Sequence, residues 1–384
     1  MRSVSVLAIL WALAGLVPSA SVVAVVRAAD PAGFRTLQIG DPAPDFSLPA
    51  VDGKTYALGD FADRRLLLVI FTCNHCPTAQ AYEERLAALH ADYRDKGVAV
   101  VAISPNDDRA VRLDELGYTD VGDSFADMKL RAEERGFAFP YLYDGETQKV
   151  SLAYGAVATP HVFLFDQHRK LRYSGRIDDG EVKPPTSHDA RNALDALLAG
   201  KPVPVERTRT FGCSTKWSDK RKDAVAYLEK ADQEPVELQT IDEAGLKALV
   251  RNETDKLLLI NVWASWCGPC VTELPEFVTM NRMYRRRDFQ MVTISMDELD
   301  QREDALKVLK EKRVAVTNYI ADVGDRDRLA EAIDGEWSGP VPYTILVAPG
   351  GKVLYRESNA VDSLKLRRRI VDFLGRTYAK RASK

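Results

Sequence analysis

The chain has 384 residues, of which 46% are hydrophobic and 28% charged, and its formal net charge at pH 7 is −3. This composition excludes an intrinsically disordered chain, which combines few apolar residues with a large net charge. The length favours two domains, because one domain commonly spans about 100–200 residues. The nearly balanced charge gives no reason to expect a nucleic-acid partner, and we expect none.

Residues 1–29 are predicted to direct export. They begin with Met1-Arg2-Ser3, continue as an apolar run from Val4 to Val26, and end in the small-residue exit Arg27-Ala-Ala29. A basic start, an apolar centre and small residues at the end are typical of a secretory signal peptide. An uncleaved membrane anchor is the alternative, since roughly 20 apolar residues can span a bilayer. Both alternatives place the rest of the chain in the periplasm or outside the cell.

The first half of the chain alternates apolar runs of strand length with segments of helical period, which is the pattern of an α/β domain. In chain order we expect a hairpin over 45–58, a strand over 66–71, a helix over 78–93, a strand over 98–103, and a hairpin from strands 162–165 and 170–174. The strand over 66–71 leads directly to Cys73. The first cysteines therefore lie where a buried strand gives way to a helix.

The second half repeats this order. We expect a strand over 256–262 leading to Cys267, a helix over 276–286, a strand over 290–295, and a hairpin from 343–347 and 352–356. Proline and charged residues between the halves predict a linker with one helix. The predicted organisation is an export segment over 1–29, a first domain over 36–204, a linker over 205–235 and a second domain over 236–380.

Four of the five cysteines form two close pairs, Cys73 with Cys76 and Cys267 with Cys270, and Cys213 stands alone. A disulfide-stapled scaffold scatters its cysteines over loops, whereas Cys-X-X-Cys pairs are typical of reactive dithiols. Disulfides also form and persist in the exported location that we expect. We predict that the four paired cysteines are catalytic.

The place of each pair at the start of a helix suits thiol chemistry. A helix N-terminus carries a partial positive charge, which stabilises a thiolate and lowers its pKa. The thiolate attacks a substrate disulfide, and the second cysteine then attacks the mixed disulfide. We expect Cys73 and Cys267 to attack, and Cys76 and Cys270 to resolve. No cofactor or metal is expected besides the redox-active disulfides, since the pairs of a shared zinc site would lie about 190 residues apart.

The second pair lies in Trp263-Ala-Ser-Trp-Cys-Gly-Pro-Cys270, which resembles the active-site signature of thioredoxins. The resemblance implies a thioredoxin fold and a cis-proline that faces the dithiol. Pro342 stands in the expected place, just before a strand. Trp266 is expected either to pack around the site or to act in it.

Two further residues of this domain depart from thioredoxins. Asn261 stands where thioredoxins carry a buried aspartate, and Glu273 follows Cys270 by three positions. This combination resembles the thiol–disulfide oxidoreductases that serve cytochrome c maturation, which implies that Glu273 moves protons at the second cysteine. A solvated helix glutamate is the alternative.

The segment Gly40-Asp-Pro-Ala-Pro-Asp-Phe-Ser-Leu48 resembles the redoxin group, which includes the alkyl hydroperoxide reductase/thiol-specific antioxidant proteins. The predicted fold class is therefore α/β, with two thioredoxin folds in tandem, each a central mixed sheet flanked by helices. As a thioredoxin-type dithiol, the first site has Pro160 as its cis-proline. As a peroxiredoxin, it would have Cys76 as the peroxidatic cysteine, but Cys73 replaces the expected threonine and Pro160 stands where an arginine is sought. We prefer the dithiol and keep the peroxidase as the alternative.

These features predict an enzyme, a thiol–disulfide oxidoreductase that acts on thiols and disulfides of exported proteins and receives electrons from an upstream thiol donor.

His75 before the second cysteine resembles strongly oxidising catalysts, whereas Gly268-Pro269 resembles reducing thioredoxins. The implied gap is about 90–150 mV, which predicts electron flow from the second site to the first or separate clients for each. A client-binding module with permanent disulfides is an alternative of another class.

The segment Phe211–Trp217 around Cys213 resembles the tails of redoxin proteins. This resemblance suggests that Cys213 acts near the first site. An inert, partly buried thiol is the alternative.

Overall fold

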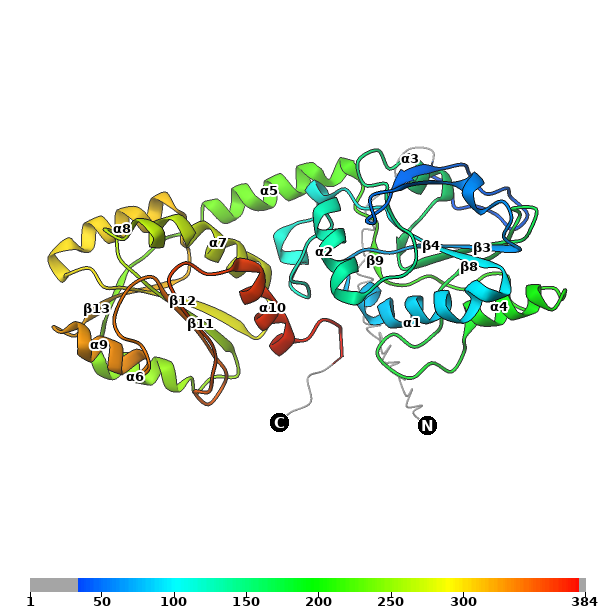
Figure 1. The fold of residues 1–384 in the computed structure, drawn as a ribbon. Helices are drawn as coiled ribbons and strands as arrows, with labels where there is room; N and C mark the ends of the chain where they lie inside the picture. Colours follow the sequence, from blue (N-terminus) through cyan, green and yellow to red (C-terminus); the bar gives the residue numbers. More distant parts are fainter. Residues whose placement is uncertain (1–33, 380–384) are drawn as a thin grey trace, which may run out of the picture. The chain divides into compact units, whose positions relative to one another are not determined.

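A computed structural model describes residues 34–379 (Figure 1). The predicted export segment over 1–29 lies outside the described residues. Within residues 34–379, no helix has the length and apolar character that a membrane crossing requires.

The first domain is built on a five-stranded mixed sheet in the order β5-β4-β3-β7-β8. Its strands are β3 (Leu66–Phe71), β4 (Val98–Ser104), β5 (Tyr141–Tyr143), β7 (His161–Phe165) and β8 (Leu171–Gly175). Strands β3, β4 and β5 are parallel, whereas β7 runs antiparallel to both β3 and β8. Every residue of β3, β4 and β7 is buried, because apolar layers cover both faces of the central strands.

Helices and a hairpin cover this sheet. The helices are α1 (Pro77–Tyr93), α2 (Phe125–Arg135), α3 (Lys149–Tyr154) and α4 (Asp189–Leu198). Apolar residues of α1, α2 and α4 pack against one face, and α3 with β1 (Ser47–Pro49) packs against the other. The predicted hairpins are confirmed, since β1 pairs with β2 (Thr55–Ala57) and β7 with β8, both antiparallel.

Part of the predicted linker is integral to the first domain. Strand β9 (Cys213–Ser214) pairs antiparallel with β6 (Ala158–Thr159), far back in the sequence. The backbones approach so closely that a Cβ on Gly212, whose φ is 134°, would lie 2.1 Å from the Thr159 carbonyl oxygen. Only glycine suits this position. The domain boundaries remain predictions, but the segment before α5 (Arg221–Asp232), the expected linker helix, is fixed beside β6.

The second domain has a six-stranded mixed sheet in the order β10-β13-β12-β11-β14-β15. Its strands are β10 (Gln239–Asp242), β11 (Leu257–Trp263), β12 (Phe289–Ser295), β13 (Thr317–Asp322), β14 (Tyr343–Val347) and β15 (Val353–Ser358). The first four strands in the sheet order are parallel, and β14 is antiparallel to both its neighbours. The predicted strands of this half are all present, with small shifts at their ends.

The helices of this domain include one that begins earlier than expected. They are α6 (Glu243–Arg251), α7 (Gly268–Tyr284), α8 (Arg302–Glu311), α9 (Arg326–Ile333) and α10 (Ser363–Leu374). The prediction of a helix over 276–286 placed its start too late, because α7 begins directly after Cys267 and continues through Pro275. Pro269 lies in the first turn, where a missing N–H costs no intrahelical hydrogen bond. The predicted α/β fold class, with two thioredoxin folds in tandem, is confirmed.

Two candidate thiol–disulfide sites

The second domain carries a disulfide at the start of α7. Cys267 and Cys270 are bonded to each other, and Cys267 is the N-cap of the helix. Its sulfur accepts a hydrogen bond from the backbone N–H of Cys270 at 3.3 Å. Cys270 is fully buried, whereas Cys267 follows Trp266, whose side chain is 52% exposed. Cys267, which is 7% exposed, thus lies next to an exposed side chain and at the positive end of a helix.

Asn261 and Glu273 form a buried polar pair between β11 and α7. Asn261 donates from Nδ2 to Glu273 Oε1 at 3.2 Å, and the other Glu273 oxygen accepts from the Val361 N–H at 3.1 Å. Burial raises the pKa of Glu273, although these hydrogen bonds oppose the shift. Glu273 is three positions after Cys270 and hence on the same helix face. The alternative of a solvated glutamate is wrong here, because the residue is buried.

Both predicted proline positions have the expected geometry. The peptide bonds Thr159-Pro160 and Val341-Pro342 are cis. Each proline directly precedes a strand that pairs with the strand leading to the cysteines, β7 with β3 and β14 with β11.

The first site differs in which cysteine begins the helix. The N-cap of α1 is Cys76, and Pro77 occupies the first turn. The Cys76 sulfur lies 3.5 Å from the donating N–H of Ala79, just as the Cys267 sulfur accepts from Cys270. Cys73 lies in the loop between β3 and α1.

Sheet register confirms this correspondence independently. Phe71 pairs with the residue after Pro160, and Val262 pairs with the residue after Pro342. Five positions separate Phe71 from Cys76, and five separate Val262 from Cys267. Cys76 therefore stands in the place of Cys267. The two Cys-X-X-Cys pairs are out of register by three residues.

The surroundings make Cys76 the better thiolate. Burial opposes its charge, but hydrogen bonds from Cys213 and Cys73, the charge of His75 and the Ala79 N–H together lower the pKa of Cys76 well below its ordinary value. Burial and the hydrogen bond to Cys76 raise the pKa of Cys73 well above its ordinary value. The expectation that Cys73 attacks finds no support in these surroundings.

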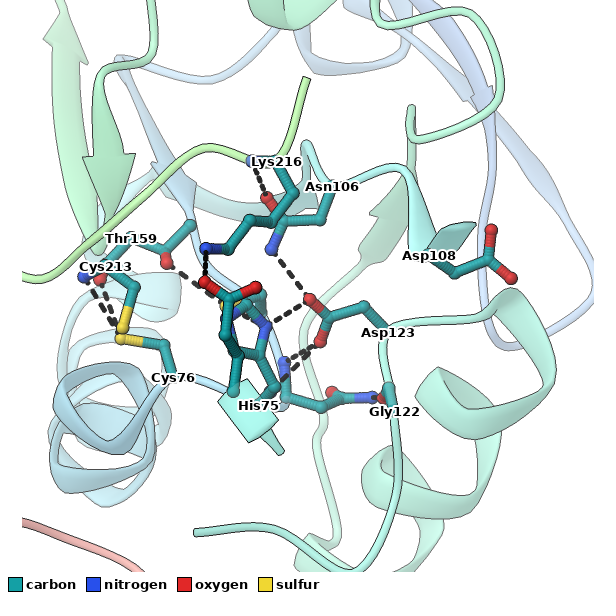
Figure 2. Close-up of polar contacts among 12 residues, drawn as sticks. His75, Cys76, Asn106, Asp108, Gly122, Asp123, Thr159, Cys213 and Lys216 are labelled. Carbon is teal, nitrogen blue, oxygen red and sulfur yellow. Dashed lines mark hydrogen bonds and ion pairs between the residues drawn. The ribbon is translucent and has the colours of Figure 1, made fainter. Parts of the chain in front are cut away.

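His75 forms a buried ion pair beside the cysteines (Figure 2). Its Nδ1 lies 2.5 Å from Asp123 Oδ2, and both side chains are at most 1% exposed. Asp123 also accepts the backbone N–H groups of Asn74 and His75 and the Nδ2 donor of Asn106. Burial disfavours the charged imidazole, but the Asp123 carboxylate outweighs it and the pKa of His75 is raised. The raised pKa of His75 favours its protonated, positively charged form close to the two cysteines.

Cys73, His75 and Asp123 offer potential metal-ligand atoms within 4.8 Å of one another. The Asp123 oxygens already accept four hydrogen bonds or ion-pair contacts, and His75 Nδ1 is one of those donors. We assign this cluster to charge stabilisation of the thiol site and place no metal in it.

Asp123 and Asn106 were not predicted from the sequence. No local sequence pattern marks these residues, since they reach the site from distant loops.

Cys213 completes the first site from β9. Its backbone N–H donates to the Cys76 sulfur at 3.3 Å, and its side chain packs against Cys73, Cys76 and Ala79. Figure 2 shows its sulfur next to that of Cys76. The resemblance of residues 211–217 to redoxin tails suggested that Cys213 lies near the first site, and the pairing of β6 with β9 shows that it contacts Cys76.

Comparison with protein families identifies both halves of the chain. Residues 38–194 match the Redoxin family model, and residues 233–356 match the AhpC/TSA family model.

Curated relatives and solved structures show further similarity. The thiol-disulfide oxidoreductase ResA of Bacillus thuringiensis (strain Al Hakam) is 25% identical over 118 residues, which are 29% of this chain and 61% of the relative. The thiol:disulfide interchange protein DsbE of Yersinia pestis is 29% identical over 154 residues, 39% of this chain and 71% of the relative. The chain thus spans only about three fifths of the ResA relative's length. A solved structure of an uncharacterized conserved protein from Geobacillus kaustophilus is 41% identical, with a TM-score of 0.43, and the match covers 48% of this chain and 95% of that one.

Proposed function

We propose that the chain is a thiol–disulfide oxidoreductase of exported proteins, because residues 38–194 match the Redoxin family model and residues 233–356 match the AhpC/TSA family model. The names of the ResA and DsbE relatives support disulfide exchange as the chemistry. The observation that carries the proposal is the Cys267–Cys270 disulfide at the N-terminus of α7, beside the exposed Trp266.

The second site is suited to two-electron exchange with a protein disulfide. After reduction, the Cys267 thiolate attacks a client disulfide, forms a mixed disulfide and releases one client thiolate. Cys270 then attacks the Cys267 sulfur, which restores the intramolecular disulfide and releases the second client thiolate. We assign the proton of Cys270 to Glu273, since burial raises the pKa of this carboxyl group and so makes it a better proton acceptor.

The proposed partners follow from this reaction. The clients supply disulfides or dithiols, and an upstream thiol donor must return two electrons to Cys267 and Cys270 in each cycle. The periplasmic or secreted location rests on the sequence of residues 1–29.

Peroxide reduction by the first domain is a second candidate function. It is favoured by Cys76, the cysteine expected to be peroxidatic, because Cys76 caps α1 and its surroundings lower its pKa. Hydrogen peroxide consumption by the full chain, with and without Cys76→Ser, tests it. Consumption that depends on Cys76 would establish the peroxidase activity.

Reduction of insulin disulfides by the full chain, with dithiothreitol as electron donor, tests the main proposal. We expect Cys267→Ser to lower the rate by about 100-fold, because the attacking thiolate is lost. Activity that is unchanged in Cys267→Ser, Cys73→Ser and Cys76→Ser would contradict the proposal and support a client-binding module.

A further inference from the structure

Three cysteines with free thiols meet in the first domain, whereas the second domain has two cysteines, which form a disulfide. Cys76 lies among them and receives hydrogen bonds from both Cys73 and Cys213. Cys73 Sγ is also 3.1 Å from the Thr159 hydroxyl oxygen and 3.7 Å from His75 Nδ1. A stabilised thiolate thus has two candidate partners for a disulfide.

The backbone holds Cys213 at this site. Its N–H donates to the Cys76 sulfur, and the pairing of β9 with β6 places it opposite Thr159. Glycine at position 212 allows this approach, because any larger residue would collide with the Thr159 carbonyl oxygen. The contact between residues 76 and 213 is therefore built into the fold and does not depend on a mobile side chain.

Access to external partners differs among the three thiols. Cys76 is fully buried and Cys73 is 3% exposed, but Cys213 is only partly buried. Thiol–disulfide exchange depends on which sulfur a partner can reach and on how well the departing thiolate is stabilised. Cys213 is thus the least buried of the three cysteines, and Cys76 is the best-stabilised leaving group.

We propose that Cys76 and Cys213 are the redox couple of the first domain, that Cys213 meets external thiols and disulfides, and that Cys73 is a positioning residue. This inference rests on the proposed function, because it takes disulfide exchange as the reaction. It replaces the Cys73–Cys76 couple that the sequence spacing suggests.

The exchange balances with an external thiol as reductant of the Cys76–Cys213 disulfide. An external thiolate attacks the Cys213 sulfur, the S–S bond breaks, and Cys76 leaves as the stabilised thiolate. A second external thiolate attacks the external sulfur of the mixed disulfide, and Cys213 leaves and takes up a proton from water. An external disulfide has formed and two electrons have passed to the protein; oxidation of the reduced protein by an external disulfide is the reverse of these steps.

Disulfide mapping of the unmodified full chain tests the couple directly. The reduced protein is equilibrated with oxidised and reduced glutathione, quenched with acid, alkylated and digested with trypsin. Cleavage after lysine and arginine places Cys73 and Cys76 in peptide 66–85 and Cys213 in peptide 210–216. We expect these two peptides to become linked. A disulfide within peptide 66–85, or no disulfide at any glutathione ratio, would overturn the inference.

Three serine variants assign the sulfurs. The link should persist in Cys73→Ser and disappear in Cys76→Ser and Cys213→Ser. Cys76→Ser should instead accumulate glutathione on Cys213, because no thiolate remains to resolve it. A link that persists in Cys76→Ser, or glutathione on Cys73 in that variant, would contradict the proposal. Insulin reduction through Cys267 in the same preparations separates the two hypotheses: if it continues without the link, only this inference fails.

Discussion

The two cysteine sites use the same position of the fold with different partners. In each domain one cysteine caps the helix that follows the central strand, Cys76 in the first domain and Cys267 in the second. Each lies five residues after the strand residue that pairs with the residue following the cis-proline. In the second domain, the partner Cys270 lies three residues later, inside α7. In the first domain Ala79 takes that position, and the nearby thiols come from the preceding loop and from β9.

The polar surroundings differ in the same way. Asn261 and Glu273 correspond by position to Ile70 and Tyr82, so the first site has no carboxyl group at the place of Glu273. It has instead the buried His75–Asp123 ion pair. The second site has the buried carboxyl group that our proposed proton transfer requires, and the first site has surroundings that lower the pKa of Cys76.

The largest expected difference is in reduction potential. A stabilised thiolate favours the reduced form, so the first site should be more oxidising than the second by roughly 90–150 mV, or about 4–7 kcal/mol. Glutathione titration of the full chain, read by alkylation of each cysteine peptide, measures both potentials in one sample. Equal potentials would contradict the predicted electron flow from the second site to the first.

Loss of the ion pair should be the next largest effect. We expect Asp123→Asn to lower the free energy of unfolding by about 3–5 kcal/mol, because it leaves His75 and two backbone N–H groups without a charged partner. Urea unfolding checks this, with the exposed Asp108→Asn as the matched control, since Asp108 points away from the site (Figure 2). Equal free energies of unfolding of the two variants would show that the His75–Asp123 ion pair does not stabilise the fold.

This contribution should depend on pH in a defined direction. Because the pKa of His75 is raised in the folded state, its contribution to the free energy of unfolding is complete below about pH 6.5. This contribution is lost as pH rises through the raised pKa. Because the pKa of Asp123 is lowered in the folded state, its contribution to the free energy of unfolding is complete above about pH 4. This contribution is lost as pH falls through the lowered pKa. The difference in stability between wild type and Asp123→Asn should therefore be greatest between about pH 4 and 6.5.

Much of this comparison was predictable from the sequence. Long apolar runs identify the central strands, and the cysteine pairs and prolines identify both site loops. The three-residue offset between the sites was missed, although Pro77 marks it, because proline favours the first helical position and its neighbour Cys76 is then the N-cap. Asp123 was beyond reach, since 48 residues separate it from His75. The resemblance of residues 211–217 to redoxin tails suggested that Cys213 lies near the first site, but its contact with Cys76 depends on a distant strand pairing.

Removal of the carboxyl group from the second site should slow its proton transfer. We expect Glu273→Gln to reduce insulin reduction by about 100-fold, the low end of general acid–base contributions, and to remove the pH dependence that the raised pKa of Glu273 imposes. Glu276→Gln, on the exposed face of α7, is the control and should leave both unchanged. A parallel pH profile in Glu273→Gln and wild type would assign Glu273 a structural role only.

The smallest effect is expected from displacing β9. Gly212→Ala keeps all five cysteines but forces the chain away from Thr159, at a cost of about 1–3 kcal/mol. Formation of the link between peptides 66–85 and 210–216 should slow, whereas the same change at Gly59, where a Cβ meets nothing within 4 Å, should have no effect. An unchanged rate of link formation in Gly212→Ala would show that the position of β9 does not control the disulfide between the two peptides.

The central claim is that Cys76, rather than Cys73, is the first domain's counterpart of Cys267. Thiolate absorbance at 240 nm, followed in the reduced full chain as pH is lowered, tests it most directly, because the contribution of the second site cancels between variants. We predict that, at pH values below the ordinary titration range of a thiol, the wild type and Cys73→Ser retain a thiolate signal that Cys76→Ser lacks. A signal that persists in Cys76→Ser and disappears in Cys73→Ser would contradict the account.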